Sequence, residues 1–258
     1  MRVVPRSLWT SFGLVSVIFM LSPLLLVIFF SFGSNPNATL PIGGLTVRWY
    51  RVLLENADFW RALNNSLIVT LSVGVLSTLI GTAAAMALAR WPVRVASSAM
   101  AVLTTPVMLP PLVLALALAT AFSTAGVHLS VWTVIPSHLV FTQPFVILIV
   151  YAQMANFDHA VIESARDLGA SRLRAFVTVV LPIIRPTVIG AALIAMAVSL
   201  DDFVITFFTI GGGMTLPTLV WGMLRTAIDP SINALGSIII VATIGSSALA
   251  LYLTRYRG

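Results

Sequence analysis

The sequence predicts an all-α, polytopic membrane protein with about six transmembrane helices. Of its 258 residues, 59% are hydrophobic and only 9% are charged. Apolar runs of about 20 residues, the length that crosses a bilayer, recur along the chain. A soluble domain usually carries about 25% charged residues. A chain with so few cannot cover a water-facing surface with polar groups, so lipid must be part of its solvent.

The first expected span covers residues 8–30, behind two arginines. It is too long for a signal peptide and lacks a clear cleavage site, so we interpret it as an uncleaved span. A polar stretch follows at residues 31–61. Its aromatic residues Trp49, Tyr50 and Trp60 are typical of a membrane interface.

The second and third spans are expected at residues 65–89 and 99–122. Asn64, Asn65 and Ser66 offer an N-cap for the second span. Three prolines interrupt the third span, at Pro106, Pro110 and Pro111. Proline removes a backbone donor and clashes with the preceding turn, so we expect this span to kink or break.

The fourth, fifth and sixth spans are expected at residues 131–154, 186–210 and 233–254. Between the fourth and fifth, residues 156–185 alternate apolar and charged side chains at helical spacing. This pattern predicts one or two amphipathic helices outside the bilayer. Three consecutive glycines at residues 211–213 are expected to end the fifth span.

The arginines indicate the orientation of the chain. With the N-terminus inside, ten of the fourteen arginines lie on the inner side and four on the outer side. This bias agrees with the positive-inside rule and predicts that both termini are cytoplasmic. We expect a single transmembrane domain over residues 1–258. Residues 1–62 would form the first span and outer loop, and residues 63–258 a five-span core.

Several functions are excluded by composition. All fourteen basic residues are arginine, so the lysine of a Walker A phosphate loop is missing, and the chain has no cysteine. We therefore expect no enzymatic activity and no bound cofactor. The histidines His128, His138 and His159 show no metal-binding spacing. The scattered arginines form no continuous basic face, so we do not expect nucleic acid binding.

The charged segment carries a distinctive pattern. Glu163-Ser164-Ala165 is followed after three residues by Gly169, and nine residues later by residues 179–182, Val-Val-Leu-Pro. Gly169 can end one helix and Pro182 can stop the next. Glu163 and Asp167 are four residues apart on one helical face, where like charges repel. A basic groove on a partner would relieve this repulsion. Alternatively, the segment is a solvated surface helix with a Glu163–Arg166 pair.

This pattern resembles the Glu-Ala-Ala…Gly…Ile-x-Leu-Pro signature of membrane subunits in bacterial ATP-binding cassette (ABC) importers. Ser164 replaces Ala and Val179 replaces Ile, and both changes preserve shape. The resemblance covers nearly the whole chain and is strongest to spermidine/putrescine-type permeases. Four further stretches carry it: residues 49–54, 59–67, 199–203 and 230–234.

The resemblance implies a type I ABC importer permease (MetI-like) fold in the bacterial inner membrane, with a cytoplasmic coupling helix that docks into a separate ATPase subunit. The docking residues would be Glu163, Ser164, Ala165, Arg166, Asp167, Leu168, Gly169 and Ala170. It also implies a second, related permease, two copies of the ATPase, which would bind ATP, and an extracytoplasmic substrate-binding protein. Transport would follow alternating access.

An acidic pair, Asp201 and Asp202, lies inside the fifth expected span. An ionised carboxylate there costs about 2.5–3.5 kcal/mol on insertion scales, so such residues are functional candidates. Because helical neighbours are about 100° apart, we expect the two not to face the same groove. A cationic substrate would supply a counter-charge, with Phe203 and Trp221 as further contacts. Alternatively, one Asp binds backbone at a helix break, or an arginine of a partner.

These observations favour an importer permease subunit that forms half of a translocation path, with a polyamine as its cargo. The same machinery could instead carry sulfate, molybdate or ferric iron. A proton-coupled secondary transporter or channel would need no ATPase and would use Asp201 or Asp202 as a relay. A structural scaffold is the fourth alternative.

Overall fold

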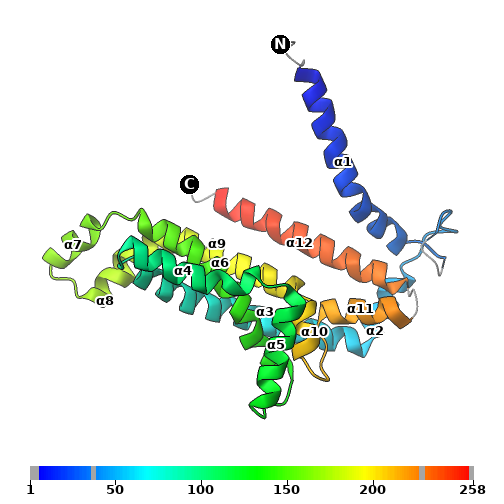
Figure 1. Cartoon of the computed structure of the whole chain (residues 1–258). Coiled ribbons are helices and arrows are strands. Elements are labelled where there is room, and N and C mark those ends of the chain that lie inside the picture. The colour runs from blue at the N-terminus through cyan, green and yellow to red at the C-terminus, as the bar shows by residue number, and fades with distance from the viewer. Residues whose placement is uncertain (1–5, 36–38, 227–229, 256–258) are drawn as a thin grey trace, which may run out of the picture. The chain divides into compact units, whose positions relative to one another are not determined.

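The computed structural model describes residues 6–35, 39–226 and 230–255 (Figure 1). Within these ranges the chain is almost entirely helical, which confirms the predicted fold class. The chain divides into two compact units. The first contains residues 1–60 and 220–258, and the second residues 61–219. That residues 1–258 form one transmembrane domain stays a prediction.

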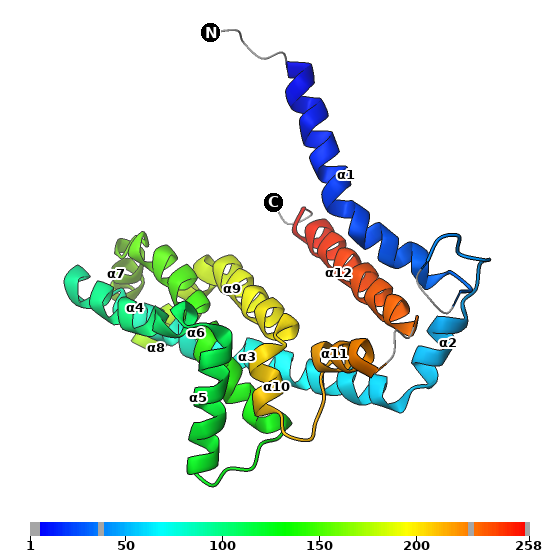
Figure 2. The same cartoon turned by 45° about the vertical axis from the view of Figure 1, so that its right-hand side comes forward.

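The first unit is built from α1, α2 and α12, with the end of α11. The bounds are α1 Arg6–Ser31, α2 Arg48–Glu55, α11 Leu216–Thr226 and α12 Ser231–Arg255. In both views the last turns of α1 lie beside the start of α12 (Figures 1 and 2). Gly236 permits this approach, since a Cβ there would lie 3.0 Å from the Val27 Cγ1 atom.

Helix α2 ties this unit together through its aromatic residues. The Tyr50 hydroxyl lies 2.7 Å from Ser31 Oγ at the end of α1 and 3.1 Å from Ser237 Oγ on α12. The Trp49 indole N–H donates to the carbonyl of Gly33 at 2.7 Å. These two side chains therefore act as tertiary hydrogen-bond partners between helices, as well as suiting a membrane interface.

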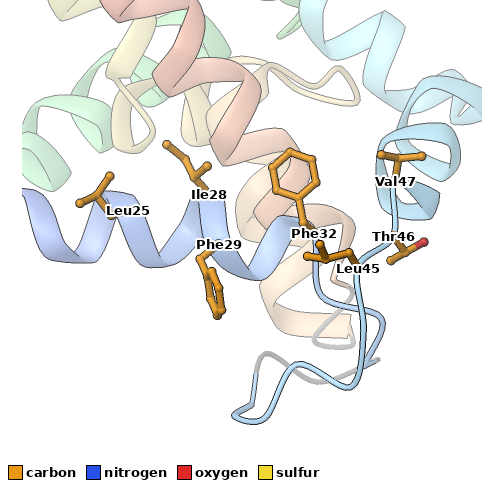
Figure 3. Close-up of a pocket in the computed structure, with 7 residues that line it drawn as sticks. All are labelled: Leu25, Ile28, Phe29, Phe32, Leu45, Thr46 and Val47. Carbon is orange, nitrogen blue, oxygen red and sulfur yellow. The ribbon is translucent and has the colours of Figure 1, made fainter.

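An apolar groove of about 830 Å³ lies along the last turns of α1 (Figure 3). Its walls are Leu25, Ile28, Phe29 and Phe32, with residues 45–47 of the returning chain opposite. No lining side chain carries a charge. This groove is therefore unsuited to holding a charged solute.

The second unit is arranged around α6. Its elements are α3 Ala57–Leu88, which begins in the first unit, α4 Val93–Met108, α5 Pro111–Thr124, α6 Val131–Ala155, α7 Ala160–Asp167, α8 Arg172–Ala175, η1 Phe176–Val180, α9 Leu181–Asp201 and α10 Val204–Thr209. Helix α6 contacts α4, α5, α9 and α10. Its residues Val146 and Val150 are fully buried in the main apolar core.

The third expected span breaks where its prolines predict. Helices α4 and α5 meet at an angle of 97° across Leu109 and Pro110. Leu109 has extended backbone, with ψ 142°, because a following proline disfavours the helical conformation. Figure 1 shows α5 turning away from α4.

The fifth expected span, residues 186–210, also breaks, as expected from the alternative in which one Asp binds backbone at a helix break. Helix α9 ends at Asp201, Asp202 has extended backbone with ψ 121°, and α10 begins at Val204. The cause is local: the Asp202 carboxylate accepts the backbone N–H of Thr206 at 2.9 Å and so competes with helix continuation. Figure 2 shows α10 beside α5.

Pro182 does not stop a helix, contrary to the prediction. Helix α8, the π-helical turn η1 and α9 follow one another without a gap, and Pro182 lies in the first turn of α9. In η1 the Leu181 N–H donates to the carbonyl of Phe176, five residues back. This wider turn accommodates a proline that has no N–H to donate.

Asn65 and Ser66 are not an N-cap, because α3 already begins at Ala57. They bind the chain at the start of α11 instead. The Asn65 amide donates to the carbonyl of Met214 at 2.8 Å, and Ser66 Oγ accepts the N–H of Leu216 at 2.8 Å. Two polar residues inside a helix thus satisfy a carbonyl just before α11 and the first N–H of α11.

The length and the apolar composition of the helices confirm that the chain is a multi-pass membrane protein. Four helical stretches qualify: Trp9–Ser31, Ala57–Leu88, Val131–Ala155 and Arg172–Asp201. The bent pair α4–α5 qualifies when it is taken together. The sixth expected span falls in α12, whose described apolar part, Ser231–Gly245, is shorter than a full span. The rest of that expected span lies outside the described side chains.

Close packing of α3 on α6 yields a stability prediction. A Cβ on Gly81 would lie 2.6 Å from Val146 Cγ1, a rigid buried side chain. We expect Gly81→Ala to destabilise the purified protein by about 1–3 kcal/mol through overpacking. Gly190→Ala on α9 is the matched control, since a Cβ there meets no atom within 4 Å. Thermal unfolding in detergent measures both, and equal melting temperatures would contradict the prediction.

Candidate functional site

The charged segment forms a short exposed helix, α7, with a sharp turn behind it. None of the eight residues Ala160–Asp167 is buried. Leu168, the residue after the helix, is 90% exposed. The segment therefore presents charged side chains and one apolar side chain to its surroundings.

Backbone geometry at Gly169 makes this turn rigid. Gly169 has φ +87°, the left-handed conformation expected of a glycine that ends a helix. Its N–H donates to the carbonyl of Arg166 at 2.9 Å, and the N–H of Ala170 donates to that of Ala165 at 3.0 Å. This is the Schellman arrangement, which satisfies two terminal carbonyls of α7. The predicted role of Gly169 in ending the helix is confirmed.

All eight predicted docking residues lie on α7 and this cap. Among the described residues, no ion pair joins Glu163 to Arg166, the contact on which the surface-helix alternative depends. The hydroxyl of Ser164 donates to the carbonyl of Ala160 at 2.9 Å, so it turns toward its own helix. The Glu163 carboxylate therefore remains at the surface of the segment, available to a partner.

The second candidate site is a groove where both broken spans meet. It encloses about 760 Å³. The lining comes from α4, α5, α6, α9 and α10 and includes Pro106, Leu109, Phe141, Asp201, Asp202 and Phe203. Helix breaks inside a membrane protein are tolerated where they line a cavity or are buried in protein. The groove is apolar apart from its two acids.

The two acids differ in their surroundings. Both line the groove, so the expectation that they would not share it is wrong; helical spacing does not apply across the end of α9. Asp201 is exposed, and no described residue forms a hydrogen bond or ion pair with its carboxylate. The Asp202 side chain is only 13% exposed.

His138 on α6 is the partner of Asp202, and sequence reasoning missed it. Its ring is 1% exposed, and its Nε2 atom lies 3.3 Å from Asp202 Oδ2 and 2.9 Å from Thr206 Oγ1. Its Nδ1 atom lies 2.8 Å from Ser199 Oγ. A usable signal existed: Ser199, Asp202 and Thr206 follow at helical spacings of three and four, and a buried histidine needs such partners.

The two predicted aromatic contacts lie in different units. Phe203 lines the groove beside Asp202, with its ring 5.4 Å from that of Phe207. Trp221 lies on α11 in the first unit, where the Arg225 guanidinium is 5.9 Å from its ring centre. Phe141 on α6 also contributes to the groove and packs against the His138 ring at 5.2 Å.

Curated relatives match this chain over most of their length. The chain is 31% identical to the spermidine/putrescine transport system permease protein PotC of Escherichia coli K12, over 86% of this chain and 84% of that protein. It is 32% identical to the putrescine transport system permease protein PotI of the same strain, over 93% and 88% respectively. PotC of Haemophilus influenzae is 28% identical over 95% of each chain.

Solved structures share the fold. One chain of a bacterial ABC transporter for the import of the acidic polysaccharide alginate superposes with a TM-score of 0.69 at 16% identity, covering all of both chains. A chain of the inward-facing MetNI methionine ABC transporter gives 0.60 at 16% identity, covering 80% of this chain and 95% of that one. At these identities the likeness shows the fold alone, and it confirms the predicted permease fold.

The family model for the binding-protein-dependent transport system inner membrane component matches residues 77–256, which include α7, its cap and the acidic groove. Together with the relatives at 31% and 32% identity, this match shows that the chain belongs to the family of binding-protein-dependent transport system inner membrane components, the permease subunits of ABC importers.

Proposed function

We propose that this permease carries polyamines across the bacterial inner membrane, as one half of the translocation path of an ATP-driven importer with both termini in the cytoplasm. The observation that carries the proposal is the exposed Asp201 carboxylate, at two helix breaks, in a groove that is apolar apart from Asp201 and Asp202. Broken membrane helices commonly mark substrate sites in transporters.

The chemistry of the groove suits a polyamine. A polyamine alternates ammonium groups with short methylene chains. The carboxylate offers a counter-charge for an ammonium group, while Phe141 and Phe203 offer faces for methylenes or a cation–π contact. The names of PotC and PotI, which refer to spermidine and putrescine, support the same cargo. Sulfate or molybdate would be repelled by Asp201 in a site of low dielectric.

The energy for transport comes from outside the chain. The chain contains no lysine for a phosphate loop, so we propose that ATP is bound only by partner subunits. The projecting α7, followed by the exposed Leu168, would dock into one ATPase subunit and receive its motion. A second related permease would complete the path, and an extracytoplasmic binding protein would deliver the substrate.

The cargo is tested on the intact complex in proteoliposomes. ATP hydrolysis is measured with the binding protein loaded in turn with spermidine, putrescine, sulfate or ferric iron. We expect stimulation and uptake with the two amines and neither with the other ions. Stimulation by sulfate or iron alone would show that the cargo is that ion and not a polyamine. Nucleotide-independent uptake would point to a secondary transporter.

The docking role is tested with a pair of matched glycine variants. Gly126 ends α5 with φ +69° and the same two backbone hydrogen bonds, from Gly126 to Ser123 and from Val127 to Phe122. Proline holds φ near −65° and lacks an N–H, so each Gly→Pro change disrupts an equivalent cap.

We expect Gly169→Pro to abolish amine uptake and its coupling to ATP hydrolysis, while Gly126→Pro retains both. Membrane insertion and complex assembly are checked for each variant by purification of the assembled complex. Full uptake by Gly169→Pro, or equal loss in both variants, would exclude a specific docking role for this turn.

A further inference from the structure

The adjacent carboxylates of Asp201 and Asp202 differ in exposure and in hydrogen bonding. Asp201 is exposed in the groove without a partner among the described residues, whereas Asp202 is withdrawn to 13% exposure. Withdrawing a carboxylate from solvent is costly unless donors compensate it. The hydrogen-bond donors around Asp202 therefore determine whether its carboxylate is already compensated within the chain.

Three donor groups converge on Asp202 from two helices. From α10, the Thr206 N–H and hydroxyl lie 2.9 Å and 3.2 Å from Asp202 Oδ2. From α6, His138 Nε2 lies 3.3 Å from the same oxygen. A proton on Nε2 lets His138 donate toward Thr206 and Asp202, while its Nδ1 accepts the hydroxyl of Ser199. Every polar atom of the His138 ring is then satisfied.

The surroundings leave this network little freedom. Only about 10 Å³ remains between His138, Ser199, Asp202 and Thr206, and the other polar lining side chains are the hydroxyls of Ser66, Thr70 and Thr215. No titratable group other than His138 and Asp202 lines that space. A well-packed network of this kind fixes one side-chain arrangement.

We propose that His138 is a positioning residue: it clamps Asp202 as the cap of the α9–α10 break, so that Asp201 alone presents its carboxylate to the substrate. The assignment of Asp201 rests on the proposed polyamine function. The clamp itself does not, because it concerns contacts within the chain.

The clamp is tested without substrate by a double-mutant cycle. His138→Gln and Asp202→Asn keep size and polarity but remove the imidazole ring and the carboxylate charge, and thermal unfolding in detergent is measured for each and for the double variant. We expect each single change to lower the melting temperature and the double variant to lose clearly less than the sum. His128→Gln, on an exposed histidine in the loop after α5, is the matched control and should be additive with Asp202→Asn.

Additive losses for His138→Gln and Asp202→Asn would overturn the clamp. If His138→Gln does not accumulate in the membrane, Ser199→Ala takes its place in the cycle, since it removes only the hydroxyl at Nδ1. Coupling of Ser199→Ala to Asp202→Asn would support the clamp, and additivity would overturn it.

The division of roles is tested by uptake of spermidine and putrescine in the intact complex at saturating loaded binding protein. We expect Asp201→Asn to lower spermidine uptake about tenfold or more, the effect of losing one contact to a charged group. Putrescine, with fewer charges, should suffer less, so the ratio of the two rates changes. Asp201→Glu should restore both rates.

A purely structural change moves both rates together. We expect His138→Gln and Asp202→Asn to lower uptake of the two amines by the same factor, with the ratio unchanged. A changed ratio in Asp202→Asn with a normal ratio in Asp201→Asn would reverse the assignment. If the complex transports neither amine, the proposed function fails while the thermal cycle still decides the clamp.

Discussion

A helix that breaks inside an apolar bundle must find new partners for the backbone groups that the break exposes, and the candidate substrate site depends on this constraint. Water is scarce there, so an unpaired N–H or carbonyl costs several kcal/mol. At the α4–α5 break, proline removes one donor outright, at Pro110. At the α9–α10 break, the Asp202 carboxylate accepts the N–H of Thr206. The two breaks meet at one groove, which therefore has walls that a pair of continuous helices could not form.

The turn behind α7 also has to satisfy terminal backbone groups of a helix, here in an exposed segment. Its terminal carbonyls are satisfied by a glycine in the left-handed conformation rather than by side chains. The side chains of Glu163 and Leu168 are consequently left for contacts outside the chain. In the proposed docking role, a segment whose backbone hydrogen bonds are complete would transmit motion well, because little of an applied displacement is lost in local rearrangement.

The sequence was sufficient for features that depend on neighbours along the chain. The positions of the first four expected spans, the proline break near Pro110 and the turn at Gly169 follow from local residue types. Two of the failures come from contacts between distant segments. Asn65 resembles an N-cap locally but binds a carbonyl 149 residues away, and His138 looks isolated but meets Ser199 at a separation of 61 residues. Pro182 failed for another reason: a π-helical turn absorbed it.

Two adjacent ionised acids in a membrane span are energetically costly, since like charges side by side repel and each must be desolvated. This cost argues against both of them binding the substrate. In the structure the two carboxylates have different hydrogen-bond surroundings. The Asp202 carboxylate already has donors from His138 and Thr206, so a passing cation would have to compete with them. The Asp201 carboxylate has no such competitor among the described residues. Under the proposed function, a fixed cap next to an uncommitted charge would let the groove hold its shape while a substrate enters and leaves.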